Sequence, residues 1–390
     1  MKKSLVALAA FSACGLSLAQ SSVTLFGVLD LAYENVKTNT GRISGVSPSG
    51  NAASRLGFRG VEDLGGGLAA TFWLEAAINP ASGIGSSGTT TNNQRSDVAA
   101  GGLTFNRRAT VGLTGAFGEV RLGRDTTPSW QNYLNADPFA AAGVGTLILD
   151  YTGSAAANTF VRASNSVGYI LPSGLGGVYG QAMYAFGNQA SNATINNINT
   201  ASNGRYVGAR LGYKQDALDV AAAYTRTTFA GLTQNLGNGG LAGPGTSGAA
   251  APLAGDMADT SVYGSYNFGV AKVMGIVAQQ KLSDVSKLGN AQSTKGWSLG
   301  VNAPVGAANV LASVGQVKLG NAKAQKLAVG GVYNLSKRTA LYGTLARVSN
   351  SGGASMAAGS YGSGALGPVA GAANVNSNST GIDFGVRVSF

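Results

Sequence analysis

Apolar and polar side chains alternate along much of this chain, in runs of about ten residues. The first clear run covers 23–33, a second covers 297–303, and the last covers 382–390 and ends on Phe390. A repeat of two residues with one apolar face is typical of β-strands rather than helices. No segment after the first 19 residues is an apolar run of the length, about 20 residues, that a membrane-spanning helix needs.

The connections between these runs alternate between short and long. Seven are short turns, at 63–67, 115–118, 172–177, 214–217, 267–270, 304–308 and 335–339. Others are long and rich in Gly, Ser and Asn, such as 79–102, 187–203, 229–257 and 350–378. Seven short turns join eight hairpins, which predicts an all-β fold of 16 antiparallel strands. Short turns at one end and long loops at the other are typical of a closed transmembrane β-barrel, in which every backbone group is paired.

The composition favours a barrel that faces lipid over a soluble array of β-sandwich domains, which would show a similar strand periodicity. Charged residues make up 11% of the chain and hydrophobic residues 44%. Soluble proteins carry about 25% charged residues. A surface with so little charge suits contact with lipid, and sandwich domains would not explain the alternating loop lengths.

The residue inventory excludes several kinds of chemistry. The chain has no His, which removes imidazole bases, His-assisted nucleophiles and His-ligated metals. Its only Cys is Cys14, so neither a disulfide framework nor a multi-thiolate metal site is available. We therefore expect neither an enzyme nor a bound metal. The formal net charge of +11 would suit nucleic acid, but the basic residues form no cluster, so we expect no nucleic-acid partner.

We predict that 1–19 is a cleaved secretory signal peptide and that 20–390 forms the barrel. Two lysines near the start precede a short apolar stretch at 5–11, and small residues up to Ala19 mark a cleavage point. That stretch is too short for a membrane anchor. A lipoprotein signal ending at Cys14 is the other alternative, but its apolar region would be unusually short.

Several motifs spread along the chain resemble one known family. They lie at 21–30 (SSVTLFGVLD), 54–67 (SRLGFRGVEDLGGG), 72–75 (FWLE), 118–124 (GEVRLGR), 261–272 (SVYGSYNFGVAK), 334–339 (NLSKRT) and at the terminal Phe390. Together they resemble the general porins of the Gram-negative outer membrane, in their anion-preferring branch, over the whole mature chain. The resemblance implies a 16-stranded barrel, with a third extracellular loop folded into each pore as a constriction. It also implies passive diffusion of ions and small hydrophilic solutes without a cofactor.

The same resemblance implies the partners and the location. We expect a homotrimer integral to the outer membrane, in contact with outer-membrane lipids, lipopolysaccharide and the barrel-assembly machinery. We interpret Phe390, at the end of the last alternating run, as an assembly signal. The alternative is that Phe390 simply packs against lipid, like other aromatic residues at the membrane interface.

The third long connection, 126–160, carries Asp137 and Asp150 and no basic residue. If this loop folds inward, as the resemblance implies, both carboxylates reach the lumen, where low-dielectric walls focus their field. With Glu75 they would form the acidic side of a constriction. The alternative is that the two aspartates only accept hydrogen bonds from loop amides or from the barrel wall.

Strand alternation tests where the arginine cluster of the family would lie on the wall. Where an apolar residue of a strand faces lipid, the residues next to it in sequence face the lumen. An arginine on the lipid face near the midplane costs ~2–4 kcal/mol, so arginines are expected on the lumenal face. The constriction candidates on its basic side are Arg55, Arg107, Arg108 and Arg162, and the other lumenal basic candidates are Arg59, Arg121, Arg210 and Arg387. Alternation favours Arg108 over Arg107, whereas the resemblance accepts either. These arginines either draw anions through the pore or only fill and brace the wall, with Glu75 paired to one of them.

Two classes of function follow from these expectations. The first is a general diffusion pore with a weak anion preference, or a narrower version of it specialised for one anionic solute class. The second is a structural or adhesive barrel that anchors its loops at the cell surface. Strands and loops use the whole mature chain, and nothing remains for a soluble appendage, which favours the pore.

Overall fold

The computed structural model describes residues 22–85, 92, 102–150, 159–195, 198–232, 253–284, 292–359 and 375–390. The predicted signal peptide at 1–19 lies outside the described residues. None of the described helices is long and apolar enough to cross a membrane. Among the same residues, no group of three or more acidic or thiol side chains is arranged to hold a metal ion.

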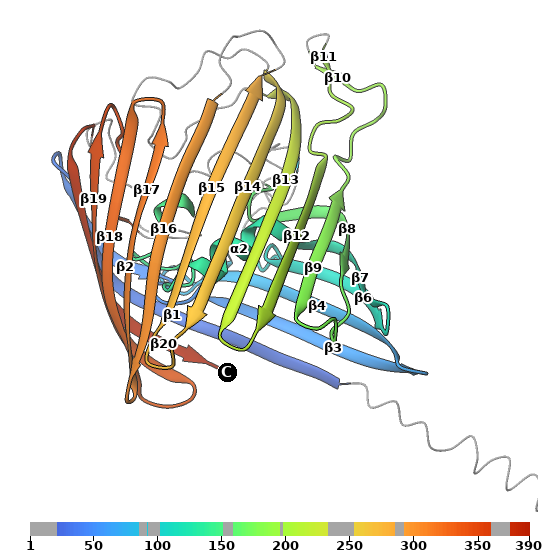
Figure 1. Cartoon of the computed structure of the whole chain (residues 1–390), viewed down its shortest axis with the longest axis horizontal. Helices are drawn as coiled ribbons and strands as arrows, with labels where there is room; N and C mark the ends of the chain where they lie inside the picture. The colour runs from blue at the N-terminus through green and yellow to red at the C-terminus, as the bar shows by residue number, and fades with distance from the viewer. Residues whose placement is uncertain are drawn as a thin grey trace, which may run out of the picture.

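Sixteen of the described strands pair antiparallel with their neighbours and close into a ring, as the alternation predicted. They are β1 (Ser22–Lys37), β3 (Arg55–Gly65), β4 (Leu68–Asn79), β6 (Arg108–Gly115), β7 (Gly118–Thr126), β8 (Arg162–Ile170), β9 (Val178–Ala185), β12 (Tyr206–Gln215), β13 (Leu218–Leu232), β14 (Leu253–Asn267), β15 (Lys272–Asp284), β16 (Gln292–Val305), β17 (Ala308–Leu319), β18 (Ala322–Asn334), β19 (Thr339–Ser351) and β20 (Asn378–Ser389). The last strand, β20, pairs with β1 and completes the barrel (Figure 1). Closure leaves this ring of described strands without an exposed sheet edge.

Four further strands are short or interrupted. β2 (Arg42–Pro48) pairs with one half of β1 while β3 pairs with the other half, so β2 and β3 follow one another along the same side of β1. β5 (Ile84–Gly85) adds two residues beside β4, and β10 (Thr194–Ile195) pairs with β11 (Ile198–Asn199) in a small separate hairpin.

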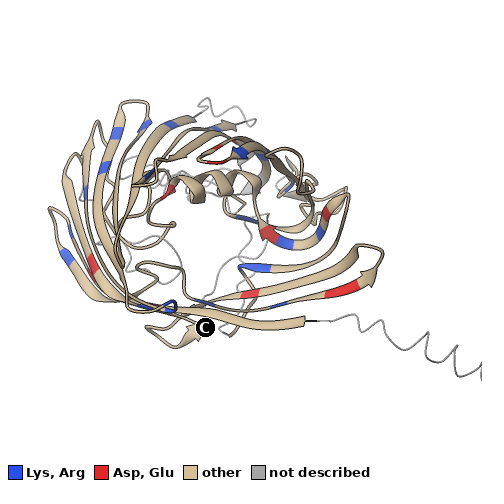
Figure 2. Cartoon of the chain, turned by 60° about the horizontal axis from the view of Figure 1, so that its bottom comes forward, with Lys and Arg blue, Asp and Glu red and all other residues tan. Residues whose placement is uncertain are grey.

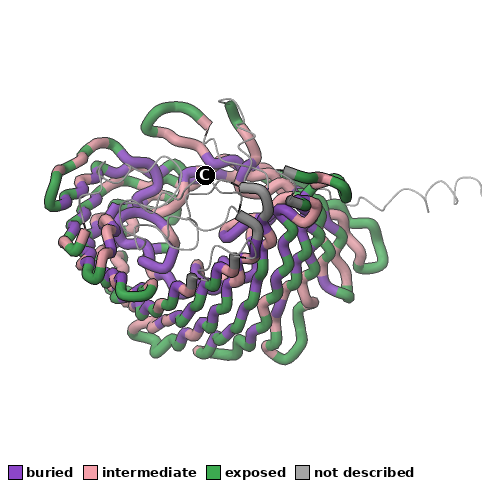
Figure 3. The backbone as a smooth tube through the Cα atoms, turned by 90° about the horizontal axis from the view of Figure 1, so that it is seen from above, coloured by how far each residue is buried: buried purple, intermediate pink, exposed green. Residues whose placement is uncertain are grey.

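Alternation along the strands separates an apolar outer face from a buried inner face. On β6 the outward residues Val111 and Leu113 are exposed, while the intervening Thr110 and Gly112 are buried. The same alternation of exposed and buried residues repeats from strand to strand (Figure 3). An exposed row of large apolar side chains on a closed barrel suits contact with lipid.

The seven short turns all lie between strands at one end of the barrel, at 66–67, 116–117, 171–177, 216–217, 268–271, 306–307 and 335–338. The longer connections lie at the opposite end, and we call it the long-connection end. One connection there is itself tight, because only residues 320–321 join β17 to β18.

A short helix, α2 (Pro128–Ala136), lies inside the ring of strands (Figure 2). It contacts β12, β13, β14, β15 and β16. Pro128 at the start of the helix suits a position whose backbone N–H would have no helical partner. The apolar spacing of Trp130, Tyr133 and Leu134 is helical, and it was the local signal that would have predicted this helix from sequence.

A buried carboxylate holds the break between β2 and β3. Asp30 is fully buried and accepts hydrogen bonds from the backbone N–H groups of Gly50 (3.1 Å), Asn51 (3.0 Å) and Ala52 (2.7 Å). These bonds satisfy amides that the interrupted strand cannot pair. The break fixes where β3 begins, and it therefore fixes the position of Arg55.

Candidate functional site

A recess of about 590 Å³ lies between the inner wall of the barrel and the segment that contains α2. Three guanidinium groups line it, from Arg55 on β3, Arg107 just before β6, and Arg162 at the start of β8. Trp130 and Leu134 of α2 supply an apolar side. Among the described residues that line it, none is acidic. The recess therefore combines concentrated positive charge with an apolar surface.

Glu75 lies behind the arginines and is fully engaged by them. Its carboxylate forms an ion pair with Arg107, lies 4.0 Å from the Nε of Arg55, and accepts a hydrogen bond of 3.1 Å from the indole N–H of Trp73. Its side chain is only 13% exposed. Glu75 therefore orients Arg107 and partly neutralises the charge of Arg55 and Arg107, and its pairing with one arginine was predicted from the sequence.

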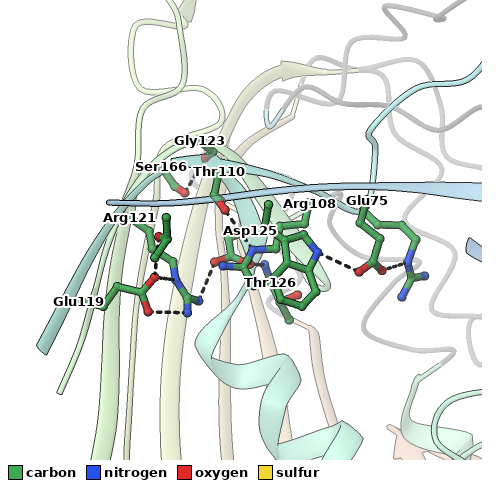
Figure 4. A network of polar contacts seen from close by, with 12 residues as sticks. Glu75, Arg108, Thr110, Glu119, Arg121, Gly123, Asp125, Thr126 and Ser166 are labelled. Carbon is green, nitrogen blue, oxygen red and sulfur yellow. Dashed lines mark hydrogen bonds and ion pairs between the residues drawn. The ribbon is translucent and has the colours of Figure 1, made fainter. Parts of the chain in front are cut away.

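Arg107 and Arg108 both turn inward, although alternation favoured only Arg108. Arg108 is the first residue of β6 and its guanidinium lies over the ring of Trp73, 4.5 Å from the centroid, and 3.5 Å from Asp125 (Figure 4). Arg107 precedes the strand, so the two-residue period does not fix its direction, and it reaches Glu75. The two arginines therefore have different surroundings. Arg107 lines the recess, and Arg108 belongs to a neighbouring network of ion pairs.

That network lies along β6 and β7 and was not predicted from the sequence. Arg121 binds the carboxylate of Glu119 at 2.7 Å and that of Asp125 at 3.1 Å (Figure 4). Alternation places residues 119, 121 and 125 on the inward face of β7, so the sequence carried the signal for Glu119 and Asp125. The two acids largely offset the charge of Arg108 and Arg121.

The other three arginines also contact inward residues, at separate places on the wall. Arg59 packs against the rings of Phe26 and Trp73, 5.5 and 5.2 Å from their centroids. Arg210 donates to Asn132 of α2 at 2.7 Å, and Arg387 donates to Asn51 at 2.7 Å. None of the three lines the recess.

Asp137 and Asp150 are both buried within the inward segment, which favours the alternative interpretation of these residues over an acidic side of a constriction. Asp137 is buried and accepts hydrogen bonds from the backbone amides of Phe139 (2.8 Å), Ala141 (2.8 Å) and Leu147 (3.2 Å). Its carboxylate caps the turn made by its own segment, which is the alternative that the sequence left open.

Asp150 is fully buried in the same place and accepts a hydrogen bond of 2.9 Å from the hydroxyl of Thr146. Burial raises the pKa of both aspartate carboxyls, and the charge of Asp137 raises that of Asp150 further. The ammonium group of Lys326 on β18 donates to the carbonyl oxygen of Thr146 at 2.7 Å. These groups fasten the inward segment to the wall.

A second set of contacts fastens α2 itself. The hydroxyl of Tyr133 donates to Asp259 of β14 at 2.6 Å and accepts from Gln280 of β15 at 3.3 Å. Its ring packs edge-on against Phe160, with centroids 5.0 Å apart. Tyr133 is fully buried, so these contacts hold the helix against the wall and set the depth of the recess.

Comparison with known proteins gives consistent results. A family model described as Gram-negative porin matches residues 4–353. The chain is 37% identical to the outer membrane porin protein 32 of Delftia acidovorans, with both chains covered over their full length. It is similar to the solved structure of an anion-selective porin from Comamonas acidovorans, with 32% identity, a TM-score of 0.73, and coverage of 95% of this chain and 100% of the other. It also shares its fold, at 15% identity and a TM-score of 0.61, with a trimer form of OmpT from Vibrio cholerae, over 95% of this chain and 99% of the other.

Proposed function

The chain belongs to the Gram-negative porin family, and we propose that its pore favours small anions over cations because of the arginine-lined recess. As an outer-membrane porin it is a channel and not an enzyme. The observation that carries the proposal is that Arg55, Arg107 and Arg162 line one recess beside the inward segment, whose described lining residues include no acid.

The physical argument is electrostatic. Two unit charges ~6 Å apart interact by roughly 3 kcal/mol at an effective dielectric of ~20. Charged side chains at the narrow part of a pore bias which ions enter, and three guanidiniums next to an apolar surface are screened less than they would be in open water. Glu75 is engaged by Arg107 and Trp73, so it reduces this bias without reversing it. The solved anion-selective porin that this chain resembles supports the same direction.

The test is a reversal potential measured across a KCl gradient in a planar bilayer. We expect the wild-type pore to prefer chloride, and we expect Arg55→Ala, Arg107→Ala and Arg162→Ala each to shift the potential toward cation preference. Arg347→Ala is the matched control, because Arg347 lies on β19 with its side chain on the exposed outer face. A wild-type preference for potassium, or an equal shift in the control, would contradict the proposal.

We also propose that the barrel forms a homotrimer. Membership of the porin family supports this, and one solved structure that shares the fold is a trimer form. Detergent-extracted protein should migrate on an unheated gel, and crosslink, as a trimer. A monomer by both methods would refute the trimer and leave the pore proposal standing.

A third part of the proposal concerns orientation: the long-connection end faces the outside of the cell, which is the usual arrangement in such barrels. An epitope tag inserted in the tight connection at 320–321 should bind antibody on intact cells. The same tag at 306–307, in a short turn at the other end, should bind only after the outer membrane is opened. The reverse pattern would overturn the orientation.

A further inference from the structure

Three lysines stand side by side on the barrel, close to the long-connection end. Lys295 of β16 is directly opposite Lys318 of β17, and Lys318 is directly opposite Lys323 of β18. Residues directly opposite on antiparallel strands have their Cβ atoms about 5 Å apart. Figure 2 shows basic residues on several neighbouring strands on this side of the barrel. We call these three residues the lysine row.

The lysine row lies on the outward face, at the edge of the apolar surface. Alternation puts Lys295 on the same face as the exposed Trp297, and Lys323 on the same face as the exposed Leu327. Trp297 follows Lys295 by two residues, a distance along the strand of about 7 Å. Tryptophan is enriched at the level of lipid headgroups, and lysine side chains extend toward that level from the apolar band. The ammonium groups of the row therefore lie where headgroups lie.

No acidic residue of the strands β16 to β19 offsets this charge. Like charges directly opposite on a sheet destabilise it, and the row contains two such pairs. Between Asp284 and Asp383 the sequence contains no Asp or Glu, so the strands β16 to β19 have no carboxylate to offer. In the described part of the chain, none of the three lysines takes part in an ion pair. The arrangement is costly for an isolated barrel and calls for an anionic partner outside it.

We propose that the lysine row is a binding site for the phosphate groups of lipopolysaccharide in the outer leaflet of the membrane. A phosphate offers several strong acceptor oxygens, and one that lies between two lysines relieves their repulsion. The acyl chains would lie against the apolar surface below the row, which Trp297 and Leu327 help to form. The inference rests on the orientation proposed above, because it places the row at the outer leaflet.

The opposite end of the barrel offers a contrast and a control. Lys214 of β12 is directly opposite Asp219, and Lys272 of β15 is directly opposite Asn302, so neither faces a like charge. Lys337 lies exposed in a short turn. Three lysines are therefore available for the same chemical change without forming a row.

The experiment compares three delipidated, detergent-purified proteins. They are the wild type, the triple variant Lys295→Gln/Lys318→Gln/Lys323→Gln, and the control Lys214→Gln/Lys272→Gln/Lys337→Gln. Each is titrated with lipopolysaccharide and with the same lipid after enzymatic dephosphorylation, and the lipid retained per polypeptide is measured. Each basic residue near an anionic surface contributes enough that removing three should weaken binding by about 100-fold. We expect that loss only in the row variant, and we expect the dephosphorylated lipid to bind the wild type as weakly.

A stability measurement separates this site from a general structural effect. In lipid-free detergent the row variant should unfold at a temperature equal to or above that of the wild type, because two repulsive pairs are gone. In membranes that contain lipopolysaccharide it should unfold at a lower temperature. If the triple variant fails to fold, Lys318→Gln alone removes both direct pairs and serves in its place.

The inference is overturned if the row variant binds lipopolysaccharide as tightly as the wild type, if the control loses as much, or if dephosphorylation changes nothing. Reversal potentials of the same proteins in bilayers without lipopolysaccharide report on the pore separately. If the binding test fails and the wild type prefers chloride, only the lipid site is rejected. If the wild type shows no preference for chloride, the proposed anion preference of the pore is rejected instead.

Discussion

The charge of the recess depends on one carboxylate. The carboxylate of Glu75 forms an ion pair with Arg107, lies 4.0 Å from the Nε of Arg55, and accepts a hydrogen bond from the indole N–H of Trp73. Because it is largely buried behind the arginines, it acts on their orientation and on the field in the recess, and it does not block the solute. By orienting the arginines Glu75 favours anion passage, and by its negative charge it opposes it. A substitution that removes the charge but keeps the hydrogen bonds separates these two effects.

Glu75→Gln should increase the anion preference of the pore. Glutamine keeps an acceptor for Trp73 and for Arg107 but removes one negative charge, which at ~6 Å and an effective dielectric of ~20 is worth roughly 3 kcal/mol before screening. The reversal potential in a KCl gradient should move further toward chloride. Glu62→Gln, on an exposed residue of β3 near a short turn, is the control and should leave it unchanged. A shift toward cations in Glu75→Gln would mean that the carboxylate matters mainly by positioning Arg107.

Single residues also show where the sequence stopped being informative. The inward direction of Arg55, Arg59 and Arg121 followed from a two-residue period, which is a local property of a strand. Arg107 lies outside its strand, and no local pattern fixes its direction. Asp150 is buried where the inward segment meets the wall. There Lys326, far along the chain, donates to the carbonyl oxygen of Thr146, and only the closed barrel brings Lys326 to this place.

At the scale of elements, the inward segment is held by buried polar groups whose protonation matters. Burial raises the pKa of the carboxyls of Asp137 and Asp150, so the folded segment favours their protonated forms. The sign follows from linkage: this contribution is complete below the unfolded pKa, ~3.9, and is lost as the pH rises through the raised values. At higher pH the ammonium group of Lys326 is needed to balance them.

Lys326→Met should therefore loosen the inward segment, and more at pH 7 than at pH 5. Removing one partner of a buried charged group costs ~3–5 kcal/mol while the carboxylates are ionised, and less once they are protonated. Hydrogen exchange of 127–150 measures this directly. Lys323→Met, on the same strand but with its side chain on the outer face, is the control. Equal protection of the segment in both variants at pH 7 would contradict the role of Lys326.

The closing strand carries the prediction for Phe390. Its backbone N–H donates to the carbonyl of Gly27 at 3.1 Å, and the N–H of Gly27 donates to the carbonyl of Phe390 at 3.0 Å. The ring lies over Gly27, where a Cβ would collide with it. Deleting Phe390 removes two bonds of the seam, about 2 kcal/mol, and uncovers Gly27.

We expect the Phe390 deletion to reduce the amount of barrel inserted in the outer membrane of cells, measured by heat-modifiable migration of membrane fractions. Phe384→Ala is the control, since Phe384 is another exposed aromatic of β20, packed against Tyr33. Wild-type insertion of the deleted form would show that Phe390 is only one of the aromatic residues that contact lipid.

For the whole molecule, the sequence predicted the architecture well and the site only in part. Sixteen strands and seven turns follow from period-two patterns and from turn residues, each of which is a short-range signal. The recess is lined by Arg55 of β3, Arg107 just before β6 and Arg162 of β8, and by Trp130 and Leu134 from a connection that returns to the wall. Such a site depends on contacts across the barrel, which no window of sequence contains. Recognising the helical spacing within 128–136 would have been the way to anticipate its apolar side.

The whole charge distribution gives the prediction on salt. The chain has 27 basic and 16 acidic residues. Three of the basic residues, Arg55, Arg107 and Arg162, are concentrated at the recess. Screening acts over a Debye length of ~10 Å at 0.1 M salt and ~3 Å at 1 M, so the distributed excess should be felt only in dilute salt. The preference for chloride over potassium, measured as a reversal potential at a fixed concentration ratio, should therefore be strongest near 0.1 M and weak near 1 M. In Arg55→Ala/Arg107→Ala/Arg162→Ala we expect the preference at 1 M to vanish and a small preference to persist at 0.1 M from the rest of the chain. An anion preference in the triple variant equal to that of the wild type at both concentrations would place selectivity outside the recess.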